Sequence, residues 1–312
     1  MAARELFVLG TASQVPTRYR NHNAYFLRWD DEGILFDPGE GTQRQLTFAG
    51  LSAHAITRIC ITHFHGDHCL GLPGIIQRLS LEACPEVTVY YPASGQRYFD
   101  NLRNASIYAR LEKLVTVPVA AGGVLFEGES FVLEAAALEH EVECYGYRVK
   151  ERDALRVRED ALKATGVAGR AVGELLRAGS VMAPDGRVVR REEVTEMRTG
   201  QSFAFVMDTR RCAGAEELAR DADLLVCEST FLSSETELAG IARHMTATQA
   251  AELARDAGAR KLVLTHFSQR YSDTSAFVEE AKVVHDDVVV AMDPDPADPA
   301  STRHRIAVPA RK

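Results

Sequence analysis

The stretch Cys60-Ile-Thr-His-Phe-His-Gly-Asp-His-Cys-Leu-Gly-Leu-Pro-Gly74 places three histidines and an aspartate within six residues. The apolar, β-branched run Ile59–Thr62 comes just before them and is typical of a short buried strand. A helical pattern follows over 73–82. The polar residues therefore lie in a loop that joins the end of a strand to the start of a helix.

The spacing within this loop brings its polar side chains together. His63 and His65 lie on the same side of an extended chain. Gly66 allows a sharp turn, which directs Asp67 and His68 back toward the two histidines. A single buried histidine is usually a satisfied core residue, but an unpaired polar cluster of this density is costly to bury. The cluster therefore predicts a metal site.

Four adjacent side chains cannot all bind one small ion without strain, because each metal site needs tetrahedral or wider geometry. Two ions that share the cluster remove this difficulty, but each then needs further ligands. The candidates follow apolar runs elsewhere in the chain, at His140, Asp208 and His266. Two cations about 3.5–4 Å apart activate a water and stabilise both oxygens of a displacement at phosphorus.

Short apolar runs recur along the chain and are read as strands. They are Leu6–Leu9, Ala24–Leu27, Ile34–Phe36, Ile59–Thr62, Val87–Tyr91, Val115–Val117, Phe131–Ala136, Phe203–Met207, Leu224–Cys227, Lys261–Thr265 and Val288–Ala291. Helical patterns separate some of them, at Pro73–Glu82, Gly95–Arg103, Ala213–Asp221, Thr246–Ala257 and Ser275–His285. The order predicts one α/β (α+β) domain over residues 1–312, with two β-rich layers between helices.

Residues 150–200 interrupt this rhythm. They are charged and rich in glycine, and no convincing strand is expected there until after Gln201. Between Arg148 and Arg198 there are 12 Lys and Arg against 9 Asp and Glu, which gives +3, whereas the rest of the chain carries −11. An insertion of this length is usually functional or disordered. A solvated helical surface would have the same composition.

The composition narrows the class of protein. The chain is 46% hydrophobic and 26% charged, as in soluble enzymes, and its formal charge of −8 argues against a general nucleic-acid coat protein. It contains no run of 18 apolar residues, and its first ten residues indicate a strand rather than a signal peptide. We therefore expect a cytoplasmic protein without membrane contact. The six cysteines form no CxxC pair and are expected to be reduced.

The motif His63-Phe-His-Gly-Asp-His68, with the three downstream candidates, resembles the ligand set of the metallo-β-lactamase superfamily. That resemblance implies an αββα sandwich. Within the superfamily the chain is more similar to the ribonuclease Z family. The similar segments are Leu9–Pro16, Arg20–Asn21, Phe36–Gln43, His68–Gly74, Glu228–Thr230, His244–Thr246 and Thr265–Tyr271.

The resemblance implies two zinc ions per subunit, although Mn²⁺ or Co²⁺ also suits such ligands. One ion would be held by His63, His65 and His140, the other by Asp67, His68 and His266, with Asp208 between them. Asp67 would also orient the attacking water. His244 would donate a proton to the leaving oxygen, and Glu228 would hold the ring of His244 in the required tautomer.

The resemblance also implies a substrate, a precursor tRNA whose 3′ trailer is removed by phosphodiester hydrolysis. Residues 150–200 correspond to a flexible arm that grips tRNA, and the family is usually homodimeric. Arg170 and Arg270 are the candidate substrate contacts. The arm tip Gly166–Arg170 lacks the family's proline and Glu196–Gln201 is less basic than usual, so the arm departs from the family's pattern for gripping tRNA. Met207 replaces the usual glycine before Asp208, and we expect it to reshape the wall of the site.

Two other functions use the same residues. A phosphodiesterase or arylsulfatase that acts on small esters would share every metal ligand. A non-enzymatic zinc-binding protein would keep the ligands without needing Glu228 and His244. A lactamase or thioesterase is disfavoured, because acyl transfer does not explain that pair.

Overall fold

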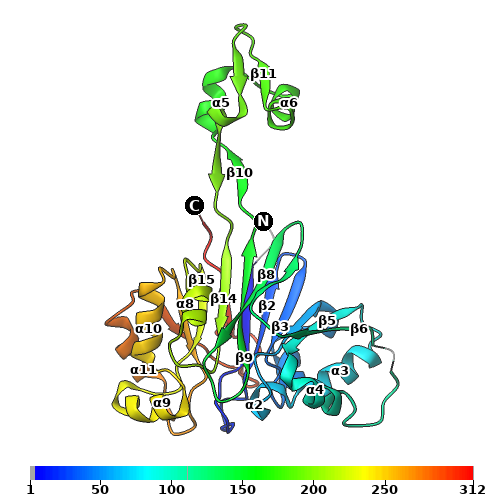
Figure 1. Cartoon of the computed structure of the whole chain (residues 1–312), viewed down its shortest axis with the longest axis vertical. Helices are drawn as coiled ribbons and strands as arrows, with labels where there is room; N and C mark the ends of the chain where they lie inside the picture. Colours follow the sequence, from blue (N-terminus) through cyan, green and yellow to red (C-terminus); the bar gives the residue numbers. More distant parts are fainter. Residues whose placement is uncertain (1–3, 111, 312) are drawn as a thin grey trace.

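Two mixed β-sheets pack face to face in the computed structural model, which describes residues 4–110 and 112–311 (Figure 1). Each sheet has seven strands. The first, in spatial order, contains β18 (Arg305–Ala307), β1 (Glu5–Gly10), β2 (Ala24–Trp29), β3 (Glu32–Phe36), β4 (Arg58–Cys60), β5 (Val87–Pro92) and β6 (Leu114–Val119). The second contains β17 (Val288–Val290), β16 (Leu262–Thr265), β15 (Leu224–Glu228), β14 (Ser202–Val206), β9 (Cys144–Glu151), β8 (Phe131–Leu138) and β7 (Gly123–Glu127).

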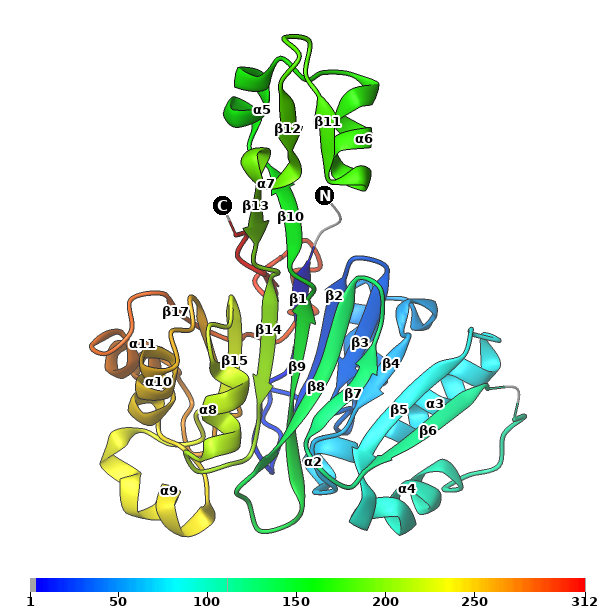
Figure 2. The same cartoon turned by 45° about the horizontal axis from the view of Figure 1, so that its top comes forward.

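Helices flank both sheets (Figure 2). The first sheet is flanked by α1 (Thr42–Phe48), α3 (Leu72–Leu81) and α4 (Gln96–Arg103), and the second by α8 (Ala213–Ala219), α9 (Thr236–Ala242), α10 (Ala247–Asp256) and α11 (Ser275–Lys282). Short turns of helix occur at α2 (Gly66–Cys69), η1 (Ala53–Ala55), η2 (Ala93–Gly95) and η3 (Ser233–Glu235). The αββα sandwich is therefore confirmed. No helix among the described residues has the length and apolar character needed to cross a lipid bilayer.

Aromatic side chains form much of the core between the sheets. Phe36 stacks on Phe205 with ring centroids 4.7 Å apart, and lies 5.6 Å from the ring of Phe203. Tyr147 closes the same cluster and donates a hydrogen bond to the carbonyl of Ile61 at 2.6 Å. That carbonyl lies two residues before His63, so the central core fixes the start of the histidine loop.

The functional loops leave the sheets at one edge. Strands β14, β15 and β16 are parallel, and β8 has the same direction because it pairs antiparallel with β9, which pairs antiparallel with β14. The carboxyl ends of these strands therefore meet at a single edge, as they do in other open α/β sheets. The sandwich thus brings segments far apart in sequence to the same place.

Residues between β9 and β14 form an arm that projects from the opposite end of the sandwich (Figures 1 and 2). Its stem is the antiparallel pair β10 (Ala154–Val157) and β13 (Thr195–Arg198). Its head contains α5 (Glu159–Thr165), α6 (Arg170–Ala178), β11 (Ser180–Met182), β12 (Val188–Arg190) and α7 (Arg191–Val194). The head has its own small core, formed by Val167, Leu175, Ala183, Val189 and Val194.

The expectation of no strand before Gln201 is wrong, because the arm contains four. Each has only three or four residues, which is too few to establish a period-2 pattern. β10 is largely exposed, so its sequence Ala-Leu-Arg-Val carries little hydrophobic signal. Pairing rather than local pattern specifies these strands: β10 pairs with β13 far along the chain, and β11 pairs with β12 in a local hairpin.

Ion pairs anchor the foot of the arm. Glu151 accepts hydrogen bonds from Arg4 at 2.8 Å and from Arg198 at 2.6 Å, and the backbone N–H of Gln201 donates to it at 3.0 Å. Glu151 ends β9, whereas Arg198 ends β13. One carboxylate therefore links the two strands that enter and leave the arm to the N-terminal strand of the body.

Candidate metal centre

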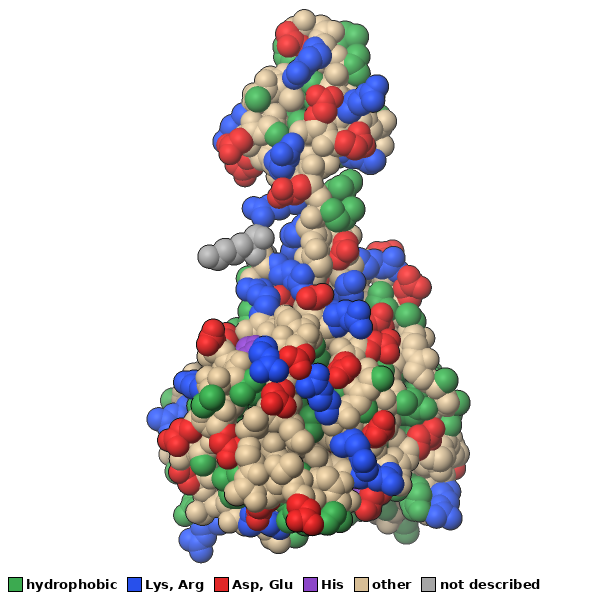
Figure 3. Space-filling view, turned by 60° about the vertical axis from the view of Figure 1, so that its left-hand side comes forward, with side chains coloured by type: hydrophobic (Ala, Val, Ile, Leu, Met, Phe, Trp, Pro, Cys, Tyr) green, Lys and Arg blue, Asp and Glu red, His purple; other side chains and the backbone are tan. Residues whose placement is uncertain are grey.

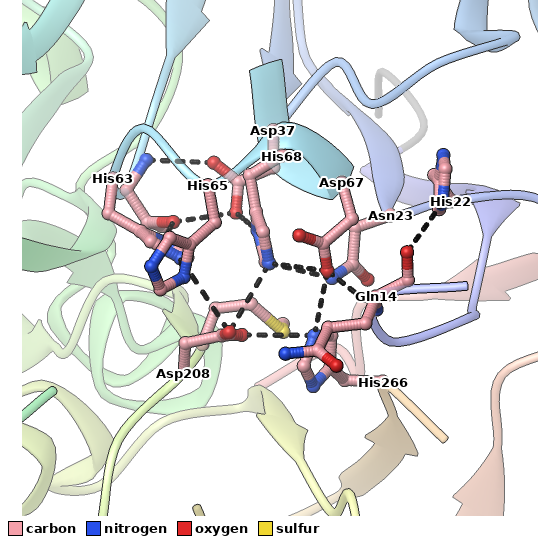
Figure 4. A network of polar contacts seen from close by, with 12 residues as sticks. Gln14, His22, Asn23, Asp37, His63, His65, Asp67, His68, Asp208 and His266 are labelled. Carbon is pink, nitrogen blue, oxygen red and sulfur yellow. Dashed lines mark hydrogen bonds and ion pairs between the residues drawn. The ribbon is translucent and has the colours of Figure 1, made fainter. Parts of the chain in front are cut away.

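All seven expected ligands come together at the edge where the loops leave the sheets, and Figure 4 labels all of them except His140. Ligand atoms within 4.8 Å of one another define one group of His63, His65, His140 and Asp208, and a second group of Asp67, His68 and His266. The first group holds His63, His65 and His140 together with Asp208, which the family resemblance places between the two groups.

The first group is built on close approach of imidazole nitrogens. Nε2 of His63 lies 2.9 Å from Nδ1 of His65, and Nε2 of His140 lies 3.3 Å from that same atom. A carboxylate oxygen of Asp208 faces His63 at 3.7 Å and His140 at 3.8 Å. Converging lone pairs of this kind are the arrangement that a divalent cation stabilises.

The second group shares Asp208 with the first. Nε2 of His68 lies 3.3 Å from Asp67 and 3.3 Å from Asp208. Nε2 of His266 lies 3.5 Å from Asp67 and 3.2 Å from the other oxygen of Asp208. Asp208 thus faces both groups, which is the position of a bridging carboxylate.

Hydrogen bonds behind the rings determine which nitrogen points inward. Thr62 donates its hydroxyl proton to Asp37 at 2.8 Å, so its oxygen accepts from Nδ1–H of His63 at 3.0 Å. Nδ1–H of His68 donates to Asp37 at 2.8 Å. Both rings therefore direct Nε2 to the centre, and in the neutral ring this nitrogen carries no proton, which is the form that binds metal.

The ring of His266 is oriented in the same way. The hydroxyl of Thr230 donates to Glu228 at 2.8 Å, so it accepts from Nδ1–H of His266, also at 2.8 Å. Glu228 is fully buried. Glu228 is thus hydrogen-bonded to Thr230, which supports the ring of His266, and also to His244.

Backbone strain is concentrated here. Asp37, Asp208 and His266 adopt positive φ angles of 44°, 40° and 63°. Such conformations cost about 1–3 kcal/mol each for residues other than glycine and persist where the surroundings fix them. The sharp turn at each strand end aims the side chain into the cluster.

Two glycines allow the loops around the cluster to approach. A Cβ at Gly39 would lie 2.1 Å from the carbonyl oxygen of Asp67, and one at Gly71 would lie 1.9 Å from the carbonyl oxygen of Gly39. Any side chain at these positions would separate the loops. This explains Gly39 in the Phe36–Gln43 segment and Gly71 in the His68–Gly74 segment.

Burial and charge act in opposite directions on the histidines. Burial lowers the pKa values of His63 and His140. Burial also acts on His68, but the carboxylates of Asp208 and Asp67 outweigh it and raise the pKa of His68. Without a compensating cation, these carboxylates would hold a proton on the ring of His68.

The residues present suit divalent cations. Among the described residues, Oδ1 of Asp208 and Nε2 of His266 are buried and make no hydrogen bond, although they lie 3.2 Å from each other. Polar atoms left in this state are costly. Imidazole nitrogens and carboxylate oxygens in this number are the donor set of zinc and related ions.

Glu228 and His244 form a pair beside the cluster. Nδ1 of His244 lies 2.8 Å from Oε1 of Glu228. The carboxylate raises the pKa of His244 to about 9 despite burial. Because Nδ1 is bonded to Glu228, Nε2 is the atom that faces Asp208 and His266, whose ligand atoms lie within 4.8 Å.

Three other residues that the sequence draws attention to, Arg270, Arg170 and Met207, are not part of the ligand cluster. Arg270 pairs with Glu235 at 2.6 Å and lies over the ring of Phe231. Arg170 is exposed at the start of α6 in the arm head. Met207 is fully buried in the core between the sheets, although it was expected to alter the wall of the site.

Asp37, Thr62 and Thr230 were given no role by the sequence reasoning. A signal did exist for Asp37, which follows the apolar run Ile34–Phe36 directly, as the ligands follow theirs. The two threonines carried none, because their function depends on which ring each one contacts across the fold.

Comparison with known proteins identifies the family. The model of the metallo-β-lactamase superfamily matches residues 17–155, and that of the β-lactamase superfamily domain matches 193–267. The head of the arm lies between the two matched segments. The chain is 57% identical to ribonuclease Z of Streptomyces coelicolor over 283 residues, which cover 90% of this chain and 92% of that protein.

Two further relatives extend over the whole length. Ribonuclease Z of Nocardia farcinica is 55% identical and is covered completely, as is this chain. The crystal structure of the short form of human tRNase Z superposes with a TM-score of 0.69 at 27% identity, over 98% of this chain and 100% of that one. The chain belongs to the ribonuclease Z family of metallo-β-lactamase-fold proteins.

Proposed function

We propose that this chain is a metal-dependent endoribonuclease that removes the 3′ trailer from precursor tRNA. The observation that carries the proposal is the Glu228–His244 pair, with its 2.8 Å contact, beside the double ligand cluster. A zinc-binding protein without catalysis has no use for an oriented histidine at this position. The family membership gives the reaction its substrate.

Two divalent cations, which we propose to be zinc, would be held by the two ligand groups with Asp208 shared between them. When bound, such ions supply Lewis acidity and lower the pKa of water. The chain's own residues must then orient the water, hold the ligand rings and protonate the leaving group.

Asp67 is placed to orient the water. One of its oxygens faces His68 and His266 and accepts from the backbone N–H of Gln14 at 2.8 Å. The nearby histidines lower the pKa of Asp67 although burial opposes this, so the group is a carboxylate. It accepts the proton that water loses as its oxygen bonds to phosphorus.

His244 is placed to complete the reaction. As the bond between phosphorus and the 3′ oxygen breaks, Nε2–H of His244 donates to that oxygen and leaves a 3′-hydroxyl on the tRNA. Glu228 holds Nδ1–H and stabilises the protonated ring beforehand. General acids of this kind contribute about 10²–10⁴-fold in rate.

The arm would bind the body of the tRNA, with Arg170 as one candidate contact. It projects from the end of the sandwich opposite to its own metal centre (Figure 1). A tRNA gripped by one arm is therefore more easily cleaved in a partner subunit, which supports a homodimer. Arg270, whose guanidinium pairs with Glu235, would be a second contact with the tRNA. The cytoplasm, where precursor tRNA is processed, is the proposed location.

The test uses the metal-loaded protein with two substrates, a precursor tRNA carrying a 3′ trailer and a chromogenic phosphodiester. Cleavage just after the discriminator nucleotide is expected, whereas hydrolysis of the small ester alone would contradict the proposal.

His244→Ala tests the proton donor. The variant should keep its metal, measured by elemental analysis, and lose at least about 10²-fold in turnover of precursor tRNA. The exposed His54 offers a matched control, because His54→Ala should leave both substrates unaffected. Full activity of metal-replete His244→Ala would refute the assignment.

A further inference from the structure

A second polar cavity lies at the foot of the arm. Its volume is about 480 Å³, and it is lined by Arg148, Lys150, Thr199, Gly200, Ser202, Asp221, Gly258, Arg260 and Arg311. We call it the arm-foot pocket. Figure 3 shows Lys and Arg side chains gathered where the arm meets the body.

The pocket is separate from the metal centre. Ser202 begins β14 and lines the pocket, whereas Asp208 follows the other end of the same strand. Six residues of extended chain span about 20 Å at 3.3 Å per residue. A ligand in the arm-foot pocket therefore does not touch the reacting atoms.

Its charge is unbalanced. Four of its lining side chains are cationic, and Asp221 is the anionic one. Arg260 and Arg311 both donate to the fully buried Asp223 at 2.7 Å, which neutralises one of these two charges. Counting both aspartates, the four cations against two anions leave a net charge of +2.

Arg148 and Lys150 supply the excess. Nε of Arg148 is buried and makes no hydrogen bond with any described residue, and its Nη1 makes only a 3.4 Å contact with the carbonyl of Glu217. Burial lowers the pKa of Arg148 and outweighs the opposing charges of Glu134 and Asp221, neither of which forms an ion pair with it. Lys150 forms no ion pair within the described residues. A buried guanidinium N–H without an acceptor is costly and is normally satisfied by a ligand or water.

The neighbouring cavity shows the contrast. It shares Asp221 and Gly258 with the arm-foot pocket, but two of its cations, Arg211 and Arg255, have carboxylate partners. Arg211 pairs with Glu216 and Asp256 at 2.9 Å each, and Arg255 pairs with Asp256 at 2.8 Å. Most of the positive charge of the neighbouring cavity is therefore neutralised, whereas Arg148 and Lys150 of the arm-foot pocket have no ion pair among the described residues.

We propose that the arm-foot pocket is a phosphate-binding site, with Arg148 and Lys150 as its principal donors. Arg–phosphate contacts are charge-assisted and favour a dianion or a phosphodiester over a neutral ligand. The position at the root of the arm makes the RNA backbone its expected source, and this choice rests on the proposed function. The other source of the same chemistry is a small free phosphate.

The test compares the variant Arg148→Gln/Lys150→Gln with the control Arg97→Gln/Lys282→Gln, which removes two exposed cations from α4 and α11. Binding of precursor tRNA is measured from 50 to 200 mM salt, a range in which phosphate contacts dominate affinity. The pocket variant should bind about tenfold more weakly, and its salt slope should fall by about one to two units. The control should bind like the parent.

Hydrolysis of the small ester, a second variant and a titration with phosphate complete the test. Hydrolysis of the chromogenic phosphodiester should be unchanged, which shows that the metal centre is intact. If the double variant fails to fold in thermal melts, Lys150→Glu replaces it, because this half-buried side chain carries no ion pair to lose. Its tRNA affinity and salt slope should both fall.

Inorganic phosphate distinguishes the two sources. If it raises the melting temperature of the parent but not of the variant while tRNA binding is equal, the ligand is a small phosphate and the RNA source is wrong. If neither tRNA binding nor the phosphate response differs, the proposal is overturned. A parent that cleaves only the small ester refutes the proposed function, whereas the phosphate titration still tests the pocket.

Discussion

At the scale of single residues, the site depends on side chains one layer behind the ligands. Asp37 accepts from Nδ1 of His68 and from both the N–H and the hydroxyl of Thr62. Burial raises the pKa of Asp37, although His68 opposes this. The sequence predicted which residues form the cluster because histidine and aspartate at strand ends have few other uses. It did not predict their supports, whose chemistry is ordinary until the fold places them.

Asp37→Asn tests this layer. The amide replaces one accepting oxygen with a donor, so it cannot accept all three hydrogen bonds, from the ring of His68 and from the hydroxyl and N–H of Thr62. Zinc affinity should fall about 10–100-fold, as it does when such supports are lost elsewhere. Competition with a chromophoric chelator measures it. Asp31→Asn, at an exposed position, should bind zinc like the parent, and equal affinity in Asp37→Asn would contradict the role.

At the scale of elements, the arm is a hairpin with a folded head. Its stem registers Val157 opposite Thr195, so the head is attached through one pair of strands. A deletion over 155–180 would remove most of β10 and leave β13 unpaired. The structure places the better boundaries at 158 and 194.

Replacing 158–194 with Asn-Gly should therefore give a closed two-residue hairpin. Hydrolysis of the small phosphodiester should be retained within about twofold, since the metal centre lies at the far end of the sheets. Cleavage of precursor tRNA should fall by at least about 10²-fold, because phosphate contacts on the arm supply binding. Equal loss of both activities, in a protein that melts normally, would count against the arm.

Glu151 at the foot of the arm makes stability depend on pH. Hydrogen bonds from Arg4, Gln201 and Arg198 lower its pKa to about 2 although burial opposes this. A depressed carboxyl pKa stabilises the folded state above the unfolded pKa of about 4.3, and this contribution is lost as the pH falls toward 2.

Glu151→Gln should lower the free energy of unfolding by about 1–3 kcal/mol at pH 7, the usual range for hydrogen bonds to a charged group. The difference in unfolding free energy between parent and variant should shrink by pH 3, since the parent has then lost part of the same contribution. Urea unfolding at both pH values measures it, with the exposed Glu129→Gln as control. A difference that is the same at pH 7 and pH 3 would exclude this origin.

At the scale of the whole molecule, prediction from the sequence succeeded where local pattern and global fold agree. The run Leu224–Cys227 and the helix Thr246–Ala257 became β15 and α10 with boundaries shifted by about one residue. The arm strands were missed because pairing alone specifies them. The arm-foot pocket was missed because Arg148, Arg260 and Arg311 meet there through three separate segments.

The arm that points away from its own metal centre has a consequence for mixtures of chains. If each tRNA needs the arm of one subunit and the catalytic residues of its partner, two inactive proteins become complementary. A chain whose 158–194 segment is replaced and a His244→Ala chain should each fail alone, yet regain up to one working site per pair when refolded together. Two chains with different defects would thus complement each other, because each supplies the part that the other lacks.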